Sequence, residues 1–464
     1  MKKRDEVIEV NVNPEIRKKI NYSLKSSITE GSFAAAMNGF GVSYFSPFAI
    51  ALKATSSQVG LMSALVSLLP SIVQLKGARL IERFSRKKVV VTGVLLQALM
   101  FIPLILLGVF FSGTSWVIWA VIGLICLIYI FGAIAHPAWF SWMGSLVPEN
   151  YRGRYFARRN RITGFFGLVT MIAGAFILDR FETLGIVMIG FGVLFALAGI
   201  FRFIAMLFFK KHYEPKLVIH KKDYFSFWSF LKRLDTPFGR FTIYTTILKI
   251  AIGIATPFFA VYILRDLNLH YLWFMIISVA GTLFHLFFLP VLGRFGDRYG
   301  NVKLLKVASF CFMVYPFLWM ASKSPYYLML VPTIFSGVAW AGLGLASSNY
   351  IYDAVRQEKR SFGVAYFNLL NGIGMFVGAG IGSLIALAPI NFMNKILFIF
   401  LISGILRLVL FAFDGGLLRE VRHVDKFKYQ FLVKEFNPVQ GFVREVHGLE
   451  KFGKKVVDGV GGKR

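Results

Sequence analysis

Long apolar runs alternate with short polar stretches along most of the chain. About twelve of these runs reach the ~20 residues that a helix needs to cross the hydrocarbon core of a bilayer. The ten-residue alternation of apolar and polar positions that marks a transmembrane β-strand is absent. The pattern predicts an all-α membrane protein with twelve transmembrane helices, at residues 32–52, 58–75, 89–111, 116–143, 162–178, 184–209, 241–264, 271–292, 307–321, 326–351, 362–388 and 396–413.

The polar stretches between these spans differ sharply in charge from one side to the other. Because Lys and Arg concentrate in cytoplasmic loops, we place the positive set inside, and both chain ends with it, as an even number of spans requires. We therefore expect a multi-pass protein of the cytoplasmic membrane. The positive set holds Arg79, Arg83, Arg86, Lys87, Lys88, Arg152, Arg154, Arg158, Arg159, Arg161, Arg294, Arg298, Lys303, Lys306, Arg356, Lys359 and Arg360, whereas the opposite set holds little beyond Lys53, Arg180, Arg265, Lys323 and Lys395.

The N-terminal sequence lacks the pattern of a cleavable signal peptide. Met1-Lys2-Lys3-Arg4 is followed by mixed polar residues, and the first apolar run begins only near Ser32. That run is too long for the apolar region of a signal peptide. We interpret it as the first span and residues 1–31 as a cytoplasmic segment.

Composition and charge exclude several other classes of protein. Only 16% of the residues are charged, against about 25% in a soluble domain. The net charge of +29 comes from Lys and Arg on one side of the membrane, so we expect contacts with lipid head groups and none with nucleic acid. Cys126 and Cys311 fall inside apolar runs and are expected to be packed thiols. Because no Walker loop and no metal-ligand spacing occurs, we predict no enzyme activity, cofactor or metal site.

The spans divide into two groups of six that resemble each other. Residues 210–240 form the one long polar connection, which we predict to be a cytoplasmic linker between residues 32–209 and residues 241–413, with residues 414–464 as a basic cytoplasmic tail. Short motifs of the first group recur in the same order about 210 positions later, which indicates a duplicated six-span unit. The pairs are Ser46-Pro47-Phe48 with Thr256-Pro257-Phe258, Glu82-Arg83 with Asp297-Arg298, Arg152 and Asn160 with Arg360 and Asn368, and Gly199-Ile200-Phe201-Arg202 with Gly404-Ile405-Leu406-Arg407.

One glycine-rich charged turn between the eighth and ninth spans carries a family resemblance. Residues 293–300 read G-x-x-x-D-R-x-G, which resembles the loop signature of the major facilitator superfamily of secondary transporters. The first-half counterpart, residues 78–88, is degenerate: Ala78 and Ser85 replace the signature glycines. Arg152-Gly153 is similar to the loop that many members carry after the fourth span. The resemblance covers residues 32–413 and implies two pseudo-symmetric six-helix bundles with a substrate site between them near the bilayer midplane.

The resemblance also narrows the kind of transporter. Superfamily proton–drug antiporters usually carry an arginine within the fourth span and a Gly-Pro motif in the fifth. Here the fourth span has His136-Pro137, and Gly164, Gly167 and Gly174 have no proline partner. The sugar-porter pattern is absent too, so a proton-driven drug exporter is disfavoured.

The charges of the signature loops are candidates for gating. The carboxylate of an acid in such a loop stabilises the N-terminus of a neighbouring helix, because the first N–H groups of a helix have no partner within it and attract negative charge. We predict two latches that hold the cytoplasmic side closed in one state and break in the other; the alternative is that these charges only set topology. The residues are Glu82, Arg83 and Glu149 in the first half and Asp297, Arg298 and Asp353 in the second. We predict that Arg83 pairs with Glu149 and Arg298 with Asp353.

Ionisable residues inside a span are expensive and are therefore candidates for function. No Asp or Glu lies in the middle of a predicted span, which disfavours proton coupling through a carboxylate. Lys249 either attracts a carboxylate or phosphate on the substrate or extends its chain to the interface. His136 either carries a proton or bonds to carbonyls freed by Pro137. Arg202 and Arg407 occupy matching positions in the repeat. For both we expect a side chain that either extends to the membrane interface or forms a structural contact between helices.

In the resembling family, spans one, four, seven and ten line the cavity. This selects Asn38, His136, Trp139, Lys249 and Asn349 as substrate-binding candidates, with an aromatic belt as the alternative role of Trp139. The resemblance implies a monomeric transporter that works by alternating access. We expect a small organic anion or amphipathic metabolite as substrate, and a non-transporting sensor or scaffold of the same fold is the alternative.

Overall fold

The protein is a bundle of long helices, described by a computed structural model for residues 14–147, 152–215, 227–355, 360–413, 418–422 and 424. All regular elements of these residues are helical, which confirms the all-α class. The first half contains α1 (Pro14–Phe40), η1 (Val42–Tyr44), α2 (Phe45–Ala51), α3 (Ser56–Arg83), α4 (Arg86–Leu99), α5 (Phe101–Phe110), α6 (Val117–Leu146), α7 (Arg152–Thr183) and α8 (Val187–Lys210).

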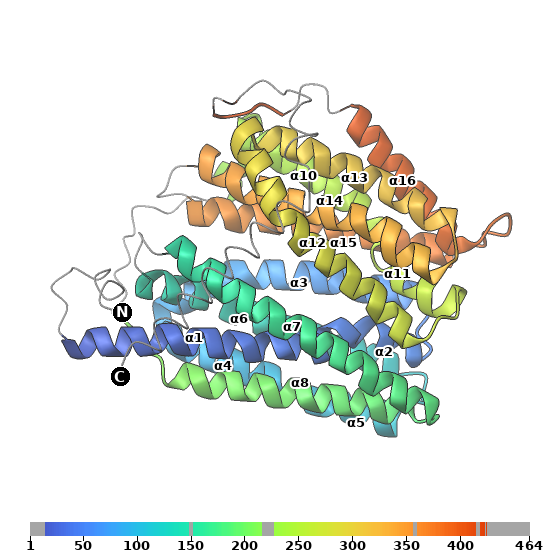
Figure 1. Ribbon diagram of the computed structural model, residues 1–464, viewed down its shortest axis with the longest axis horizontal. Coiled ribbons are helices and arrows are strands. Elements are labelled where there is room, and N and C mark those ends of the chain that lie inside the picture. Colours follow the sequence, from blue (N-terminus) through green and yellow to red (C-terminus); the bar gives the residue numbers. More distant parts are fainter. Residues whose placement is uncertain are drawn as a thin grey trace, which may run out of the picture.

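The second half repeats this plan after a short surface helix. It contains α9 (Phe227–Leu231), α10 (Pro237–Ala255), α11 (Phe258–Val261), the π-helical turn η4 (Tyr262–Asp266), α12 (Tyr271–Tyr299), α13 (Asn301–Ala321), α14 (Pro325–Ala354), α15 (Arg360–Leu387) and α16 (Lys395–Ala412). Figure 1 shows the two halves one above the other, with nearly parallel long axes.

Eleven helical segments among the described residues are long and apolar enough to cross a membrane. The first predicted span, 32–52, falls outside this set because its helix differs from the prediction. Helix α1 begins at Pro14, a favoured first helical residue, and continues through charged residues before it breaks after Phe40. The first crossing therefore consists of α1, η1 and α2 together, and residues 14–31 of the predicted N-terminal segment are helical.

The first and seventh spans break at the repeated proline motifs. Pro47 lies in α2, just after the break, and Pro257 separates α10 from α11. Proline has no N–H, so Pro47 and Pro257 remove the helical donors to the carbonyls of Ser43 and Gly253. Hydroxyls near both prolines bond to other carbonyls of the same spans. The Thr256 hydroxyl donates to the carbonyl of Ile252 at 2.8 Å, and the Ser43 hydroxyl to that of Asn38 at 3.2 Å. Both motifs thus lie close to a break in the span, inside α2 in the first half and between α10 and α11 in the second.

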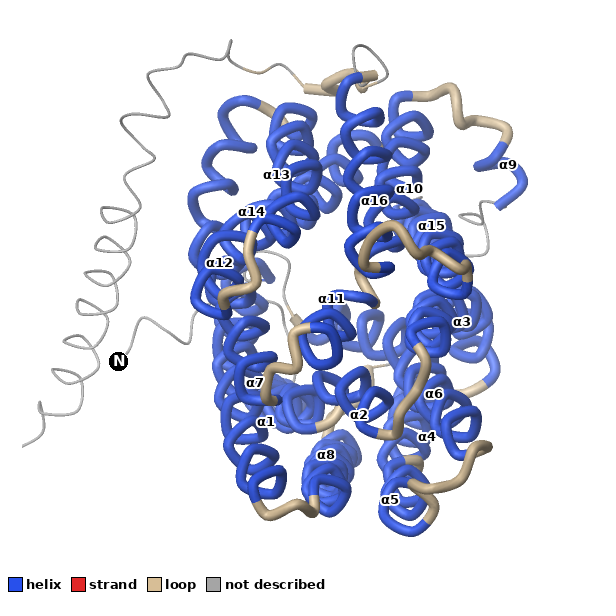
Figure 2. The backbone as a smooth tube through the Cα atoms, turned by 90° about the vertical axis from the view of Figure 1, so that its right-hand side faces the viewer, coloured by secondary structure: helices blue, strands red, loops and turns tan. Residues whose placement is uncertain are grey.

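The halves touch through two pairs of helices. Helix α3 of the first half packs against α15 of the second, and α7 packs against α12. Seen along the helices, α2 and α11 also lie next to each other at the centre, between the two halves (Figure 2).

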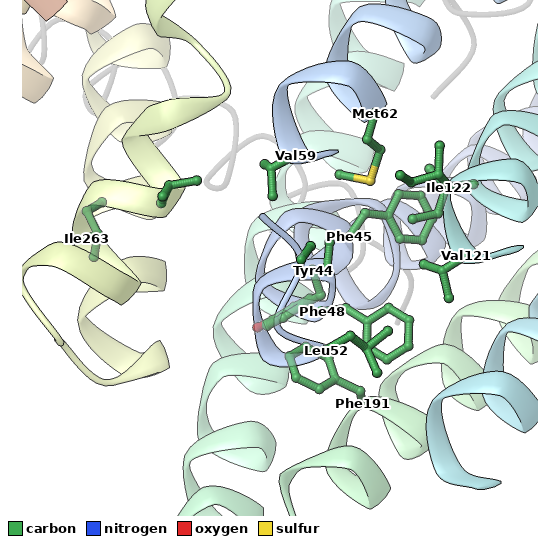
Figure 3. Packing of buried hydrophobic residues seen from close by; sticks show 14 of the residues in the cluster. Tyr44, Phe45, Phe48, Leu52, Val59, Met62, Val121, Ile122, Phe191 and Ile263 are labelled. Atoms are coloured by element: carbon green, nitrogen blue, oxygen red, sulfur yellow. The ribbon is translucent and has the colours of Figure 1, made fainter. Parts of the chain in front are cut away.

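The apolar core is shared by the two halves at one end only. We call this the opposite end, because it carries loops such as 52–55 and 267–270, and we call the end with loops 84–85 and 148–151 the basic end. At the opposite end one buried cluster joins both halves, and Figure 3 shows Ile263 of the second half facing Tyr44 and Val59 of the first. Toward the basic end the core separates into two clusters, one within each half.

Small residues set how closely α15 approaches α10. Membrane helices associate through such close contacts rather than through a hydrophobic driving force. Three glycines spaced four apart form one face of α15, where any side chain would overlap carbonyl oxygens of α10. Gly374, Gly378 and Gly382 lie against the carbonyls of Thr246, Ile250 and Ile254.

We expect Gly378→Ala to destabilise the protein, because its methyl group would overlap the Ile250 carbonyl oxygen. Overpacking of this kind costs about 1–3 kcal/mol. The matched control is Gly380→Ala on the same helix, where an added Cβ meets nothing within 4 Å. Thermal unfolding of the detergent-purified variants checks this, and equal melting temperatures for the two variants would contradict it.

Candidate functional site

Lys249 lies deep in the second half with its charge against an aromatic ring. The residue is twelve positions after Pro237, or about 18 Å along the helix at 1.5 Å per residue. Its Nζ atom is 4.2 Å from the ring centroid of Trp340 on α14, a distance typical of a cation–π contact. The side chain therefore ends inside the bundle, and substrate binding by Lys249 remains a prediction.

A cavity of about 480 Å³ opens beside this pair, entirely within the second half. Trp340 belongs both to its wall and to the Lys249 contact. Its lining residues include no Asp or Glu among those that the structure describes. Its aromatic walls are Phe259, Phe274, Tyr315, Trp319 and Trp340, and its polar side chains are Ser278, Thr282, His285, Thr333 and Ser336.

The first half contains a buried ion pair that hydropathy did not reveal. Glu30 of α1 is 1% exposed. Its Oε1 atom lies 3.0 Å from Nη2 of Arg159 and accepts from Nε1 of Trp139 at 3.3 Å. The Arg159 guanidinium also lies 4.6 Å from the centroid of the Trp139 ring. Three helices, α1, α6 and α7, are tied together at this point.

Glu30 was missed because it precedes the first apolar run by two residues. The signal that would have found it is a polar face with helical spacing. Ser23, Ser26, Ser27 and Glu30 are all buried on α1, at intervals of three or four residues that place them on one side of the helix.

The repeated arginines are structural ties. Nε of Arg202 donates to Oε1 of Gln97 at 2.6 Å. Arg407 is 2% exposed, and its Nη1 donates to the carbonyl of Phe312 at 2.9 Å. Its other nitrogens reach the carbonyls of Ala251 and Ile252 near the break between α10 and α11. Both side chains are thus held inside the bundle, so the tie is favoured over extension to the interface.

The other predicted cavity residues fall into two groups. His136 is exposed, and its ring centroid lies 6.2 Å from that of Trp139. Asn38 is exposed in α1, close to the break that follows Phe40. Asn349 is half-buried near the end of α14. The structure thus brings His136 and Trp139 together in the first half and places Lys249 and Asn349 in the second.

Helix N-termini at the basic end are capped by acids from distant segments. Glu214, which follows α8, accepts a hydrogen bond from the Lys87 N–H at 3.2 Å and lies 3.8 Å from Nε of Arg86. Glu420, which follows α16, accepts from the Val302 N–H at 2.9 Å. The two contacts are equivalent in the repeat, since α4 and α13 open the third and ninth spans.

The signature residues of the second half lie beside this cap. The side chain of Asp353 accepts from Nδ2 of Asn301 at 2.7 Å. The Arg298 guanidinium lies 5.5 Å from the ring centroid of Tyr299. Asp297 is exposed at the end of α12, and its carbonyl accepts from Arg422 at 2.7 Å. The predicted pairing of Arg298 with Asp353 stays a prediction.

The first-half latch involves residues that the structure describes only in part. Arg83 is exposed at the end of α3. The side chain of Glu82 and the whole of Glu149 lie outside the described residues. Their roles remain predictions.

Two repeated halves of six membrane-crossing helices, closed at one end, define a polytopic transport protein. The Major Facilitator Superfamily model matches residues 31–248 and 241–440, and the chain belongs to this family. The predicted membership is therefore confirmed, and the protein is a membrane transporter rather than an enzyme.

Several solved transporters share the fold at low sequence identity. The nucleoside transporter NupG aligns with a TM-score of 0.63 at 13% identity, over 85% of this chain and 98% of its own. A D-xylose-proton symporter gives 0.64 at 13%, over 88% and 99%. An auto inhibited POT family peptide transporter gives 0.65 at 12%, over 89% and 98%. A sequence comparison with curated proteins gave no match.

We expect Glu30→Gln to destabilise the protein, because it leaves the Arg159 charge without its anion. Breaking a buried ion pair costs about 3–5 kcal/mol. The double variant Glu30→Gln/Arg159→Gln is expected to recover part of this loss, since no lone charge remains. Melting temperatures of the four proteins in one detergent check the coupling, and strictly additive effects would show that the two side chains act independently.

Proposed function

We propose that the protein carries a small organic anion across the cytoplasmic membrane by alternating access. The observation that carries this proposal is Lys249, a cation deep inside the bundle whose contact is an aromatic ring rather than a carboxylate. Burial of an unneutralised charge is costly, so a bound anion offsets that cost. Asn38, His136, Trp139 and Asn349 are proposed to complete the site from the facing helices.

The placement of the core supports the alternating-access part of the proposal. By the positive-inside rule the basic end faces the cytoplasm, with both chain ends. A core that is shared only at the opposite end then corresponds to a state closed to the outside. The charges at the basic end, including Arg83 and Arg298, are proposed to hold the alternative state closed.

We expect organic anions to stabilise the detergent-purified protein against heat, and neutral solutes or hydrophobic cations to have no such effect at matched ionic strength. A ligand that binds only the folded state stabilises it by about 2.7 kcal/mol at 100 times its dissociation constant. Lys249→Ala should abolish both this shift and uptake into proteoliposomes while leaving the ligand-free melting temperature near that of the parent.

The control for this experiment is Lys323→Ala, which removes the same charge from an exposed site outside the spans. It should keep both the shift and the uptake. Full uptake by Lys249→Ala, or stabilisation by cations alone, would contradict the anion proposal.

A further inference from the structure

The cavity in the second half has the composition of a binding site for an aromatic group. We propose that it holds the ring of an aromatic carboxylate that also bears a neutral hydrogen-bond acceptor, with Lys249 as the partner of the carboxylate. This inference rests on the proposed transport of organic anions and specifies the class of anion. The cavity that would hold the ring lies within the second half, between α11, η4, α12, α13 and α14.

The size and walls of the cavity fit one or two fused rings. Its volume of about 480 Å³ falls within the range of small-molecule sites. The aromatic walls support one another: the Phe259 ring centroid is 4.9 Å from that of Tyr315 and 4.8 Å from that of Trp319. Trp340 is held edge-on against Phe312 at 5.2 Å. Rings fixed in this way stack against a planar ligand with little loss of side-chain freedom.

One buried donor in the wall has no partner. Trp319 is 2% exposed, and its Nε1 has no hydrogen-bond acceptor among the described residues. The Tyr315 hydroxyl lies near this N–H but not in hydrogen-bonding geometry. Buried donors are nearly always satisfied, so an acceptor on a bound molecule accounts for this one. A ring nitrogen, a ring oxygen or a carbonyl supplies such an acceptor.

The charges around the cavity favour an anion over other occupants. Its lining has no carboxylate among the described residues to bind a cation. Lys249 is not a lining residue, but its Nζ atom lies 4.2 Å from the ring centroid of Trp340, which is one. A lipid acyl chain would leave the Trp319 N–H without an acceptor. An aromatic carboxylate uses the rings, the N–H and the ammonium group together.

Binding of three probes to the detergent-purified full-length protein tests this, by calorimetry. 7-Azaindole-3-carboxylate, whose pyridine-type ring nitrogen is a neutral acceptor, is the aromatic anion, and 7-azaindole-3-carboxamide is the neutral aromatic; these two are the indole probes. Cyclohexanecarboxylate is an aliphatic anion of the same charge. We expect the aromatic anion to bind about tenfold more tightly than either of the others, since one added hydrogen bond or charge contact contributes on that order.

Variants assign the contacts. Trp319→Phe keeps the ring and removes the N–H, so it should weaken both indole probes about five- to tenfold and leave cyclohexanecarboxylate unchanged. Lys249→Gln should weaken only the two anions. Gly281→Leu, which places a large side chain in the lining of the cavity, should abolish binding of the indoles. Trp273→Phe, outside the cavity lining, is the control and should change nothing.

The outcomes separate the two proposals. One outcome is that both anions bind with equal affinity, that Lys249→Gln weakens this binding, and that Trp319→Phe and Gly281→Leu leave it unchanged. This outcome overturns the aromatic site while the anion proposal stands. If the neutral indole binds as tightly as its carboxylate and Lys249→Gln has no effect, both the carboxylate inference and the anion proposal are overturned. Binding of no probe also overturns both.

Discussion

The arrangement of the two halves of this transporter depends on close contacts between a small number of helices. Within a bilayer every backbone group must be satisfied inside its own segment, so the halves meet mainly as helix against helix, with α3 on α15 and α7 on α12. At the opposite end polar contacts add to this packing. The hydroxyls of Ser57 and Ser383 lie 3.0 Å apart, and Arg265 donates to the hydroxyl of Ser56 at 3.3 Å and to the carbonyl of Ala54. Such contacts hold the halves together at the opposite end.

The deep charged side chains of the two halves differ in the partners that they contact. Glu30 and Arg159 neutralise each other, and Arg407 donates to the carbonyls of Phe312 and Ile252. These contacts stabilise the bundles, because an unpaired charge buried there would raise the free energy of the folded state. Lys249 contrasts with them, since its described contact is the Trp340 ring. Among the described residues, Lys249 is thus a deep cation whose contact is neither an anion nor a carbonyl, and the anion proposal rests on it.

The spans and the two-fold repeat were predictable because apolar length and duplicated motifs are local signals in the sequence. The start of α1 and the burial of Glu30 were not predictable from such signals, because hydropathy treats a charged residue as the edge of a span. Glu30 is stabilised by Arg159 and Trp139, which lie on helices more than a hundred positions away in the sequence. Glu214 and Glu420 were missed as caps for the same reason. The cavity near Trp319 is assembled from several helices, and no single stretch of sequence encodes it.

The most direct test of alternating access is a pair of spin-label distances in liposomes. One pair joins Arg83 and Tyr352, exposed at the basic end, and the other joins Lys53 and Phe392, exposed at the opposite end. The account predicts two populations, in which the opposite-end distance lengthens as the basic-end distance shortens, and added ligand changes their ratio. A single distance for each pair, unchanged in detergent, in liposomes and with every anion, would contradict alternating access. That result would fit a scaffold with one conformation.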